Sequence, residues 1–458
     1  MNLELQEIIS ACGGRLITDE ENVQILGIST DTRTISQGDL FVPLKGEAFD
    51  GHDYISAAVE AGAVCALTEI KSTPVDAACP LIYVNSTRRA LMDLADYFRR
   101  KHSVKVVAIT GSAGKTTTKD MIADILSRKF KTKRTIKNFN NDIGMPLSIF
   151  QLQSDDEMLV LEMGMNHANE IHELSLVGAP DIAVITHIGD AHIENFENRT
   201  GILHAKLEIV DGLRPGGTVI LNGDDPLLTG EIAMEKISGF NTLYPSKKNI
   251  VKAEPIGLQE TRCHFNWNGK DIHLTVPIPG AHMVMNALLA TVAAIELGSS
   301  PAEITAAFEN FIPPEGRLNI FQTNFQGNEL TIIDDVYNAN PASVTEAIKV
   351  LCRKTPELKN SRRVAILGDM NELGHVAQER HSEVGEFAAQ SQIDLLITIG
   401  ELSQHTHTAF AASNSSHHFP TLQEFLQKIN SIFQPKDIVL LKASRGMAFE
   451  EIVNKIKR

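Results

Sequence analysis

A glycine-rich turn followed by a lysine and two threonines carries the clearest chemical signal in this sequence. The turn reads Gly-Ser-Ala-Gly-Lys-Thr-Thr over residues 111–117 and follows the apolar run 104–109. Glycines let successive backbone N–H groups face a polyphosphate, a lysine reaches its β and γ phosphates, and a threonine hydroxyl binds Mg²⁺. The sequence therefore predicts a nucleotide site whose candidate residues are Gly111, Ser112, Ala113, Gly114, Lys115, Thr116 and Thr117.

The turn departs from the common phosphate-loop pattern, because Ile109 stands where that pattern has its first glycine. A glycine-rich loop with an incidental lysine is the alternative. We favour the phosphate loop because the strand, the glycines, the Lys-Thr pair and the following helix occur in the order that such a loop needs. We expect Lys115 to lie near solvent, so that its replacement should leave the fold intact.

Three other titratable side chains could add metal chemistry, although their spacing alone does not require it. Glu162 ends an apolar run, where a buried acid needs a positive partner, and an Mg²⁺ ion shared with Thr116 would provide one. The alternative is a carboxylate that caps a helix N-terminus. His192 lies in a loop, where a lone histidine is more often structural, and Lys206, two residues before Glu208, has the pattern of a surface lysine.

The elements that must position these side chains alternate between strand and helix patterns in the middle of the chain. Such alternation predicts a largely parallel sheet wrapped by helices, with ligands at the carboxyl ends of the strands. Polar residues that follow the strands should therefore converge at one edge of the sheet. The predicted strands span 104–109, 158–163, 181–186 and 218–222, and the predicted helices span 117–129 and 283–297.

One further α/β unit is predicted on each side of this sheet. The first begins with a short amphipathic helix that ends at Gly13 and continues with strands near 25–30 and 39–44, before a helix over 88–100. The last third has strands at 330–335, 363–367, 395–399 and 438–441, a helix over 343–352, and a polar loop, SNSSHH, over 413–418. We predict an α/β protein of three domains, namely a small N-terminal α/β unit (1–100), a central P-loop ATPase with a mostly parallel sheet (101–312) and a C-terminal Rossmann-like open α/β sheet (313–458).

Composition supports a multidomain globular protein that binds small molecules. A chain of 458 residues is too long for one core, and its formal net charge of −15 argues against a nucleic-acid-binding surface. The five cysteines have no CxxC spacing and indicate neither a disulfide framework nor a cysteine zinc site. We find no basic leader and no apolar run of membrane-spanning length. We expect a cytoplasmic monomer without membrane insertion.

Two polar loops and one arginine are further candidates for ligand binding. The loops, STDTR at 29–33 and KGEAFDGH at 45–52, flank a predicted strand. Loops of this composition more often form turns, and ligand binding is the alternative. Arg317 follows Pro313 and Pro314, where the second predicted domain joins the third. A guanidinium at this position could bind a phosphate when the two domains close.

Taken together, these residues give the chain a resemblance to the Mur ligase family over essentially its whole length. The general family motifs are TGSAGKTT at 110–117, NNDIGMP at 140–146, EMG at 162–164, AHIE at 191–194 and AKLEI at 205–209. The more selective motifs are DDVYNANP at 334–341, LGDMNELG at 367–374 and SRGM at 444–447. Met283 and His187 depart from the family pattern, since many relatives have asparagine at these two positions.

The resemblance implies an ATP-dependent ligase of peptidoglycan precursor synthesis. It would join D-alanyl-D-alanine to UDP-N-acetylmuramoyl-tripeptide through an acyl phosphate and would use ATP and two Mg²⁺ ions. One alternative is a ligase similar to folylpolyglutamate synthases, which share the ATPase core. The other is a nucleotide-gated scaffold without turnover.

The resemblance also implies roles for the residues introduced above. Glu162 would bind an Mg²⁺ between the β and γ phosphates, and His192 would bind a second Mg²⁺ beside the γ phosphate. Lys206 would be carbamylated, contrary to its charge pattern, because a carbamate supplies the anionic oxygen that a hard metal prefers. Lys115 and Arg317 would act on the phosphates.

Substrate contacts implied by the resemblance come from all three predicted domains. Asn286 would face adenine, Asp335 the ribose, and Arg317 the terminal phosphates. The residues assigned to the UDP-linked substrate are Ser29, Asp31, Arg33, Lys45, Asn140 and Asn141. The residues assigned to the dipeptide are Asn338, Asn340 and Arg445.

Overall fold

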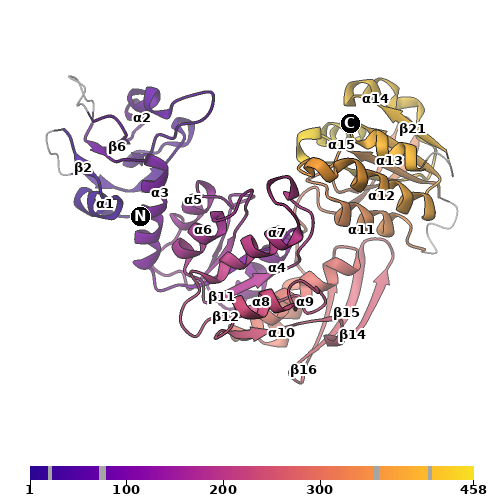
Figure 1. Ribbon diagram of the computed structural model, residues 1–458, viewed down its shortest axis with the longest axis horizontal. Coiled ribbons are helices and arrows are strands. Elements are labelled where there is room, and N and C mark those ends of the chain that lie inside the picture. The colour runs from indigo at the N-terminus through magenta and orange to yellow at the C-terminus, as the bar shows by residue number, and fades with distance from the viewer. Residues whose placement is uncertain (19–22, 72–78, 355–360, 411–414, 458) are drawn as a thin grey trace.

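The computed structural model describes residues 1–18, 23–71, 79–354, 361–410 and 415–457, and it shows three α/β units that follow one another along the chain (Figure 1). Each unit is built around one main sheet, and helices pack on these sheets. The predicted α/β fold class is confirmed, including the mostly parallel sheet of the central unit.

The N-terminal unit contains a five-stranded sheet in the order β2-β7-β6-β5-β4, in which only the edge strand β2 is antiparallel. Its long helix α3 is capped by Ser86 and packs against α1 on one side and against the central helices α5 and α6 on the other. The elements are β1 (Leu3–Glu4), α1 (Leu5–Cys12), β2 (Arg15–Leu16), β3 (Gln24–Ile25), β4 (Gly27–Ser29), β5 (Asp39–Phe41), α2 (Ile55–Glu60), β6 (Cys65–Thr68), β7 (Leu81–Tyr83) and α3 (Thr87–Arg100).

The central unit contains six parallel strands in the order β13-β12-β11-β8-β10-β9. Its strands are β8 (Lys105–Thr110), β9 (Thr132–Arg134), β10 (Met158–Glu162), β11 (Ile182–Ile185), β12 (Thr218–Leu221) and β13 (Asn241–Leu243). Its helices are α4 (Lys115–Leu126), α5 (Gly144–Ile149), α6 (Glu170–Gly178), α7 (Arg199–Leu207), α8 (Glu231–Lys236), α9 (Ala281–Glu296) and α10 (Pro301–Phe308). The four inner strands β8, β10, β11 and β12 are mostly apolar and buried, as the sequence indicated, which is typical of a parallel sheet covered on both faces.

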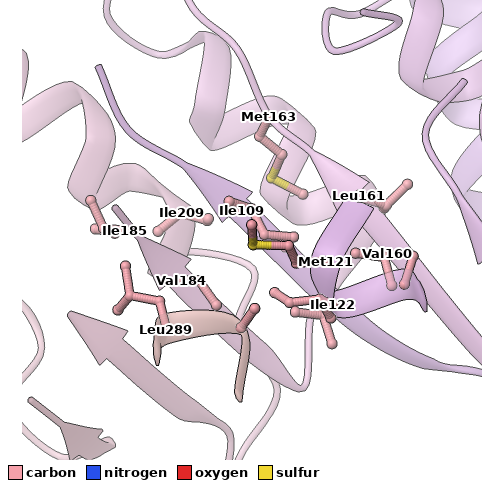
Figure 2. Close-up of a cluster of buried hydrophobic side chains, with 14 of the residues drawn as sticks. Ile109, Met121, Ile122, Val160, Leu161, Met163, Val184, Ile185, Ile209 and Leu289 are labelled. Atoms are coloured by element: carbon pink, nitrogen blue, oxygen red, sulfur yellow. The ribbon is translucent and has the colours of Figure 1, made fainter. Parts of the chain in front are cut away.

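The core of the central unit holds the start of α4 at the end of β8. Figure 2 shows Ile109 of β8 beside Met121 and Ile122 of α4, with Leu289 of α9 nearby. All four side chains are buried. This close packing of α4 against β8 holds the turn between them.

A three-stranded antiparallel sheet in the central unit was not predicted. It consists of β14 (Ile250–Ile256), β15 (Glu260–Trp267) and β16 (Lys270–Val276), and it packs against α9 and α10. Its middle strand alternates buried and partly exposed residues, which is typical of an antiparallel sheet with one solvated face. This sheet extends the unit but does not supply any of the predicted site residues.

The C-terminal unit contains a second six-stranded sheet in the order β17-β18-β22-β19-β20-β21, in which only β17 is antiparallel. Its strands are β17 (Asn319–Phe325), β18 (Asn328–Asp334), β19 (Arg363–Gly368), β20 (Leu395–Ile399), β21 (Ser416–Phe419) and β22 (Ile438–Lys442). Its helices are α11 (Pro341–Leu351), α12 (Ala377–Gln390), α13 (Ser403–Phe410), α14 (Leu422–Lys428) and α15 (Glu450–Lys457).

The prediction of a polar loop over 413–418 is wrong in part, since residues from Ser416 onward form the edge strand β21. Residues 413 and 414 lie outside the described part of the chain. An edge strand pairs on one side only, so it tolerates the polar residues that favoured a loop. Within it, the ring of His418 makes a hydrogen bond with the Thr398 hydroxyl at 2.9 Å.

Helix starts also differ from the predicted ones. Helix α4 begins at Lys115 rather than at 117, so the lysine belongs to the first turn of the helix. Helix α11 begins at Pro341, because Asn340 accepts the backbone N–H of Ser343 and proline suits a first helical position.

Candidate active site

The turn between β8 and α4 has a backbone that only glycine permits at two positions. Gly111 has a φ of +145° and Gly114 a φ of +83°. A Cβ atom at Gly111 would lie 2.0 Å from Thr186 Oγ1, and one at Gly114 would lie 2.7 Å from the Asn286 side chain. The two glycines are therefore required by the close approach of β11 and α9, in addition to any ligand.

Neighbouring segments hold this turn in place. The backbone N–H of Ser112 donates to the carbonyl of His187 at 2.8 Å, and Thr186 Oγ1 donates to the carbonyl of Ala113 at 2.5 Å. The turn leads directly into the N-terminus of α4, where the first N–H groups of a helix have no acceptor within the helix. This arrangement is a preformed anion site.

Lys115 is partly exposed rather than fully solvated. Its Nζ atom donates to the carbonyl of Gly111 at 2.8 Å, so the side chain folds back over the turn. Burial lowers the pKa of Lys115, whereas the negative charges of Glu162 and Glu372 raise it. The lysine thus feels the charge of one acid at the end of β10 and of another in the loop after β19.

Glu162 has one carboxylate oxygen without a partner. The residue is 2% exposed, and its Oε1 atom accepts a hydrogen bond from Asn140 Nδ2 at 2.9 Å, whereas Oε2 is buried and has no hydrogen-bond partner. Within the described residues no backbone N–H donates to this carboxylate, so the helix-capping alternative is wrong. A buried anionic oxygen without a donor is costly, and a cation beside it removes that cost. The residue therefore fits a bound Mg²⁺.

Lys206 is buried rather than on the surface, which contradicts its charge pattern. It is 1% exposed, and no hydrogen bond to its Nζ atom is found within the described ranges. Glu208, its expected partner, instead accepts the backbone N–H groups of Asn169 and His172 at the start of α6. Burial first, and then the positive charge of Lys115, lower the pKa of Lys206 well below its usual value. Burial therefore favours the neutral amine of this side chain over the ammonium.

His192 connects the central unit to the C-terminal unit. Its Nδ1 atom lies 2.8 Å from Glu372 Oε2, and the backbone N–H of Glu194 donates to the carbonyl of Glu372 at 3.3 Å. His192 and Glu372 both have positive φ values, 63° and 64°, which are uncommon for such residues. The hydrogen bond from His192 lowers the pKa of Glu372. Sequence reasoning did not single out Glu372, whose only signal was its place in a motif after a strand.

His187, Met283 and Asn286 lie around the same turn. His187 Nδ1 is 2.8 Å from Asp225 Oδ2, so the histidine is oriented by a buried acid. Asn286 is 6% exposed, lies against Gly114 and donates to the sulfur of Met283 at 3.6 Å. The sulfur of Met283 thus accepts a hydrogen bond from the side-chain amide of Asn286.

Arg317 and Asp335 both lie where the central unit joins the C-terminal unit. The guanidinium of Arg317 lies 4.1 Å from the centre of the Tyr337 ring. Asp335 Oδ2 accepts from Lys442 Nζ at 2.6 Å, and its Oδ1 accepts the backbone N–H of Leu318 at 3.2 Å. Lys442 was missed by sequence reasoning, although a lysine at the end of a buried apolar strand was a usable signal.

A pocket of about 800 Å³ lies between the N-terminal and central units. Its lining includes Ser29, Asp31 and Asn141, together with apolar side chains from both units. Arg33 and Lys45 do not line it, since Arg33 pairs with Asp31 and Lys45 lies 3.9 Å from Asp50. Asn140 instead donates to Glu162, and Asn141 caps α5 by accepting the backbone N–H of Gly144 at 2.8 Å.

The three residues assigned to the dipeptide surround one loop of the C-terminal unit. Asn340 is committed to capping α11, and the side-chain oxygen of Asn338 accepts the backbone N–H of Ala339 at 2.9 Å. Arg445 is exposed and its guanidinium lies 5.7 Å from the Tyr337 ring centre. Asn338 and Arg445 thus remain open to a ligand, and Asn340 shapes the loop.

Two features are absent from the part of the chain that the structure describes. It contains no group of three or more His, Cys, Asp or Glu residues arranged to hold a metal ion, so a metal here would need oxygens from a ligand. It also contains no helix with the length and apolar character to span a bilayer. All five cysteines are free.

Comparison with known proteins assigns the chain to a family. Three family models match successive stretches, described as Mur ligase family, catalytic domain (24–99), Mur ligase middle domain (109–294) and Mur ligase, glutamate ligase domain (316–445). A UDP-N-acetylmuramoyl-tripeptide--D-alanyl-D-alanine ligase from Bacillus subtilis (strain 168) is 37% identical over 445 residues, which cover 94% of this chain and 93% of the relative. The chain belongs to the Mur ligase family. The predicted resemblance is confirmed.

Other relatives of this Mur ligase carry the same description. The protein of that name from Escherichia coli (strain K12) is 31% identical, with 100% of this chain and 99% of the relative covered. A crystal structure of MurF from Acinetobacter baumannii has a TM-score of 0.90 at 31% identity and covers 100% of this chain and 99% of that one. MurF from Thermotoga maritima in complex with ADP has a TM-score of 0.81 at 26% identity, with 94% and 97% covered.

Proposed function

We propose that this Mur ligase joins D-alanyl-D-alanine to UDP-N-acetylmuramoyl-tripeptide at the expense of ATP, giving UDP-N-acetylmuramoyl-pentapeptide, ADP and phosphate for peptidoglycan synthesis. The observation that carries the proposal is the preformed phosphate turn with Glu162 Oε2 left unpartnered. It occurs in a chain whose near-full-length relatives are named for this reaction. The folylpolyglutamate synthase-like alternative is not favoured.

The chemistry follows from the poor reactivity of a carboxylate toward an amine. Transfer of the γ phosphoryl group to the tripeptide carboxylate makes an acyl phosphate, which the dipeptide amine attacks with release of phosphate. The helix N-terminus and Lys115 would hold the phosphates, and Arg317 would approach them from the C-terminal unit. Mg²⁺ held by Thr116, Glu162 and phosphate oxygens would neutralise charge on the phosphoryl group.

A second Mg²⁺ and a carbamate on Lys206 are part of the proposal. The lowered pKa of Lys206 favours the neutral amine. Its nitrogen can form a bond to carbon dioxide and release one proton, which gives an anionic carboxylate. His192 would share this ion, since its Nδ1 is oriented by Glu372 and its Nε2 makes no hydrogen bond among the described residues.

We propose domains at 1–100, 101–312 and 313–458, with the substrates bound where these units meet. The UDP group would enter the pocket lined by Ser29, Asp31 and Asn141, with Arg33, Lys45 and Asn140 at its margins. Adenine would lie against Asn286 and the ribose against Asp335. The dipeptide would contact the loop of Asn338 and Asn340, beside Arg445. We further propose that the enzyme is a cytoplasmic monomer.

The test is phosphate release by the purified chain, with each of the three substrates omitted in turn. We expect phosphate only when ATP, UDP-N-acetylmuramoyl-tripeptide and D-alanyl-D-alanine are all present, with the pentapeptide product identified by mass. Nucleotide binding without turnover under these conditions would establish the scaffold alternative and contradict the proposal.

A further inference from the structure

A buried lysine that the steps above leave without a role lies at the carboxyl end of β22. Lys442 is 2% exposed, and its Nζ atom donates to Asp335 Oδ2 at 2.6 Å and to the carbonyl of Asn338 at 2.9 Å. A buried ammonium is costly unless acceptors such as these replace water. One cation therefore connects the two ends of the loop that follows β18.

The second oxygen of Asp335 extends this connection to the segment that joins the units. It accepts the backbone N–H of Leu318 at 3.2 Å. Leu318 has a φ of +54°, a strained backbone for a branched side chain that needs support from its surroundings. The neighbouring Arg317 lies over the ring of Tyr337, which belongs to the same loop. The contacts of Lys442 thus reach the joining segment through one carboxylate.

The Asp335 carboxylate keeps acceptor capacity for a ligand. An ionised carboxylate offers about four acceptor positions, and the protein uses two of them here. Lys442 fixes the carboxylate from its buried side and leaves its remaining lone pairs free. A neutral side chain at 442 would leave Asp335 less firmly held.

We propose that Lys442 is a positioning residue that makes the nucleotide-contacting residues, Arg317 and Asp335, and the dipeptide-contacting loop of Asn338 move as one body. The inference rests on the proposed function and adds a consequence to it. Because both segments are held through the same Lys442–Asp335 contact, its loss should weaken the binding of the nucleotide and of the dipeptide together.

The test compares Lys442→Met, Asp335→Asn and the double variant in the full chain. We expect each single variant to raise the KM for both ATP and D-alanyl-D-alanine by ~10-fold, the middle of the usual range for coupled sites. The KM for UDP-N-acetylmuramoyl-tripeptide, which is assigned to the far side of the molecule, should stay within about twofold. The double variant should be no worse than the poorer single variant, because both changes remove the same contact.

Lys428→Met is the matched control, since Lys428 is exposed at the end of α14 and makes no ion pair in the described structure. It should leave all three KM values unchanged. Thermal melting and ADP titration calorimetry accompany each variant. If Lys442→Met fails to melt cooperatively, the KM values of Asp335→Asn alone test the inference, because the amide keeps the shape of the carboxylate.

Two results would overturn the inference while leaving the proposed function in place. One is an Asp335→Asn enzyme whose KM rises for ATP only. The other is a double variant whose losses are the product of the single losses. A wild-type chain without phosphate release that depends on all three substrates would instead overturn the proposed function, and the inference with it.

Discussion

The central sheet and the C-terminal sheet are both open α/β sheets with polar residues beyond their strands. The buried charged side chains of their candidate sites differ in whether the protein supplies a partner for them. In the central unit, Glu162 Oε2 has no partner and Lys206 has no hydrogen-bond acceptor among the described residues. In the C-terminal unit, two buried pairs are closed within the protein: Lys442 with Asp335 at 2.6 Å and Arg362 with Asp437 at 2.6 Å.

This difference distinguishes a ligand-binding group from a structural ion pair. An unpaired buried charge is costly, so a fold carries it where a ligand supplies the missing partner. A paired buried charge holds segments in a fixed relation without needing a ligand. Under the proposed function, the central unit would bind ATP and activate the carboxylate, and the C-terminal unit would hold the dipeptide. Four changes test the comparison.

The largest effect is expected for Lys115→Ala. We expect phosphate release to fall by at least ~10³-fold, because the side chain is the cation of the phosphate turn and its charge opposes that of the transferred group. Melting temperature should change little, since the side chain makes one hydrogen bond, to Gly111. Lys105→Ala, an exposed lysine on the neighbouring strand, should retain full activity. Normal turnover in Lys115→Ala would remove this residue from the mechanism.

Lys206 tests whether an unpaired charge marks a functional group. Lys206→Ala should lose activity by ~10²-fold or more, and short carboxylic acids such as acetate should restore part of it, because they replace the carbamate oxygen. Lys206→Met should melt no lower than the wild type, since it removes a buried amine without a partner. Wild-type turnover in Lys206→Ala would show that this residue has no role in the reaction.

Glu162→Gln keeps the shape and the contact with Asn140 but removes the negative charge. We expect the affinity for ATP with Mg²⁺ to fall by roughly 10- to 100-fold, the range found when support of a metal site is lost. The affinity for ADP without metal should be unchanged, as measured by titration calorimetry. Glu235→Gln, at an exposed position of α8, is the control. Equal losses with and without Mg²⁺ would contradict the metal assignment.

Asp334 differs from the two buried pairs named above for the C-terminal unit, and its replacement has the smallest expected effect. Its Oδ1 is buried without a partner, and burial raises its pKa to about 6. The folded state therefore binds more protons than the unfolded state between pH 3.8 and about 6, so stability falls as pH rises through this window.

Replacing Asp334 by asparagine should remove that pH dependence. We expect Asp334→Asn to be more stable than the wild type by roughly 2 kcal/mol at pH 8, with the difference vanishing near pH 4. Urea unfolding at both values measures it. A variant less stable than the wild type at pH 8 would show that the Asp334 carboxylate has a stabilising partner, contrary to this prediction.

The residues that could be predicted from the sequence are those whose role is local. The phosphate turn was predicted because strand, glycines and Lys115 are adjacent in the chain, and the structure adds why Gly111 and Gly114 admit no side chain. Burial of Glu162 followed from the apolar run before it. Local order fixes such features because backbone geometry depends on near neighbours.

Other predictions failed where distant segments decide the environment. Lys206 has the charge pattern of a surface residue, yet packing around α7 buries it while Glu208 caps α6. The strand at 416–419 has a polar sequence, yet it pairs with β20 at the sheet edge. Lys442 and Glu372 were not singled out at all, because their partners are more than 100 residues away in each case.

The sequence by itself determined the α/β class, the family and the phosphate turn, because periodicity, glycine placement and motif order are written in consecutive residues. Only the tertiary structure decided which charges are paired, that His192 meets Glu372, and that Lys442 holds Asp335. Burial and pairing depend on which distant segments come together in the fold, not on the order of residues along the chain. They exist only once β8, β18 and β22 have been brought into their sheets.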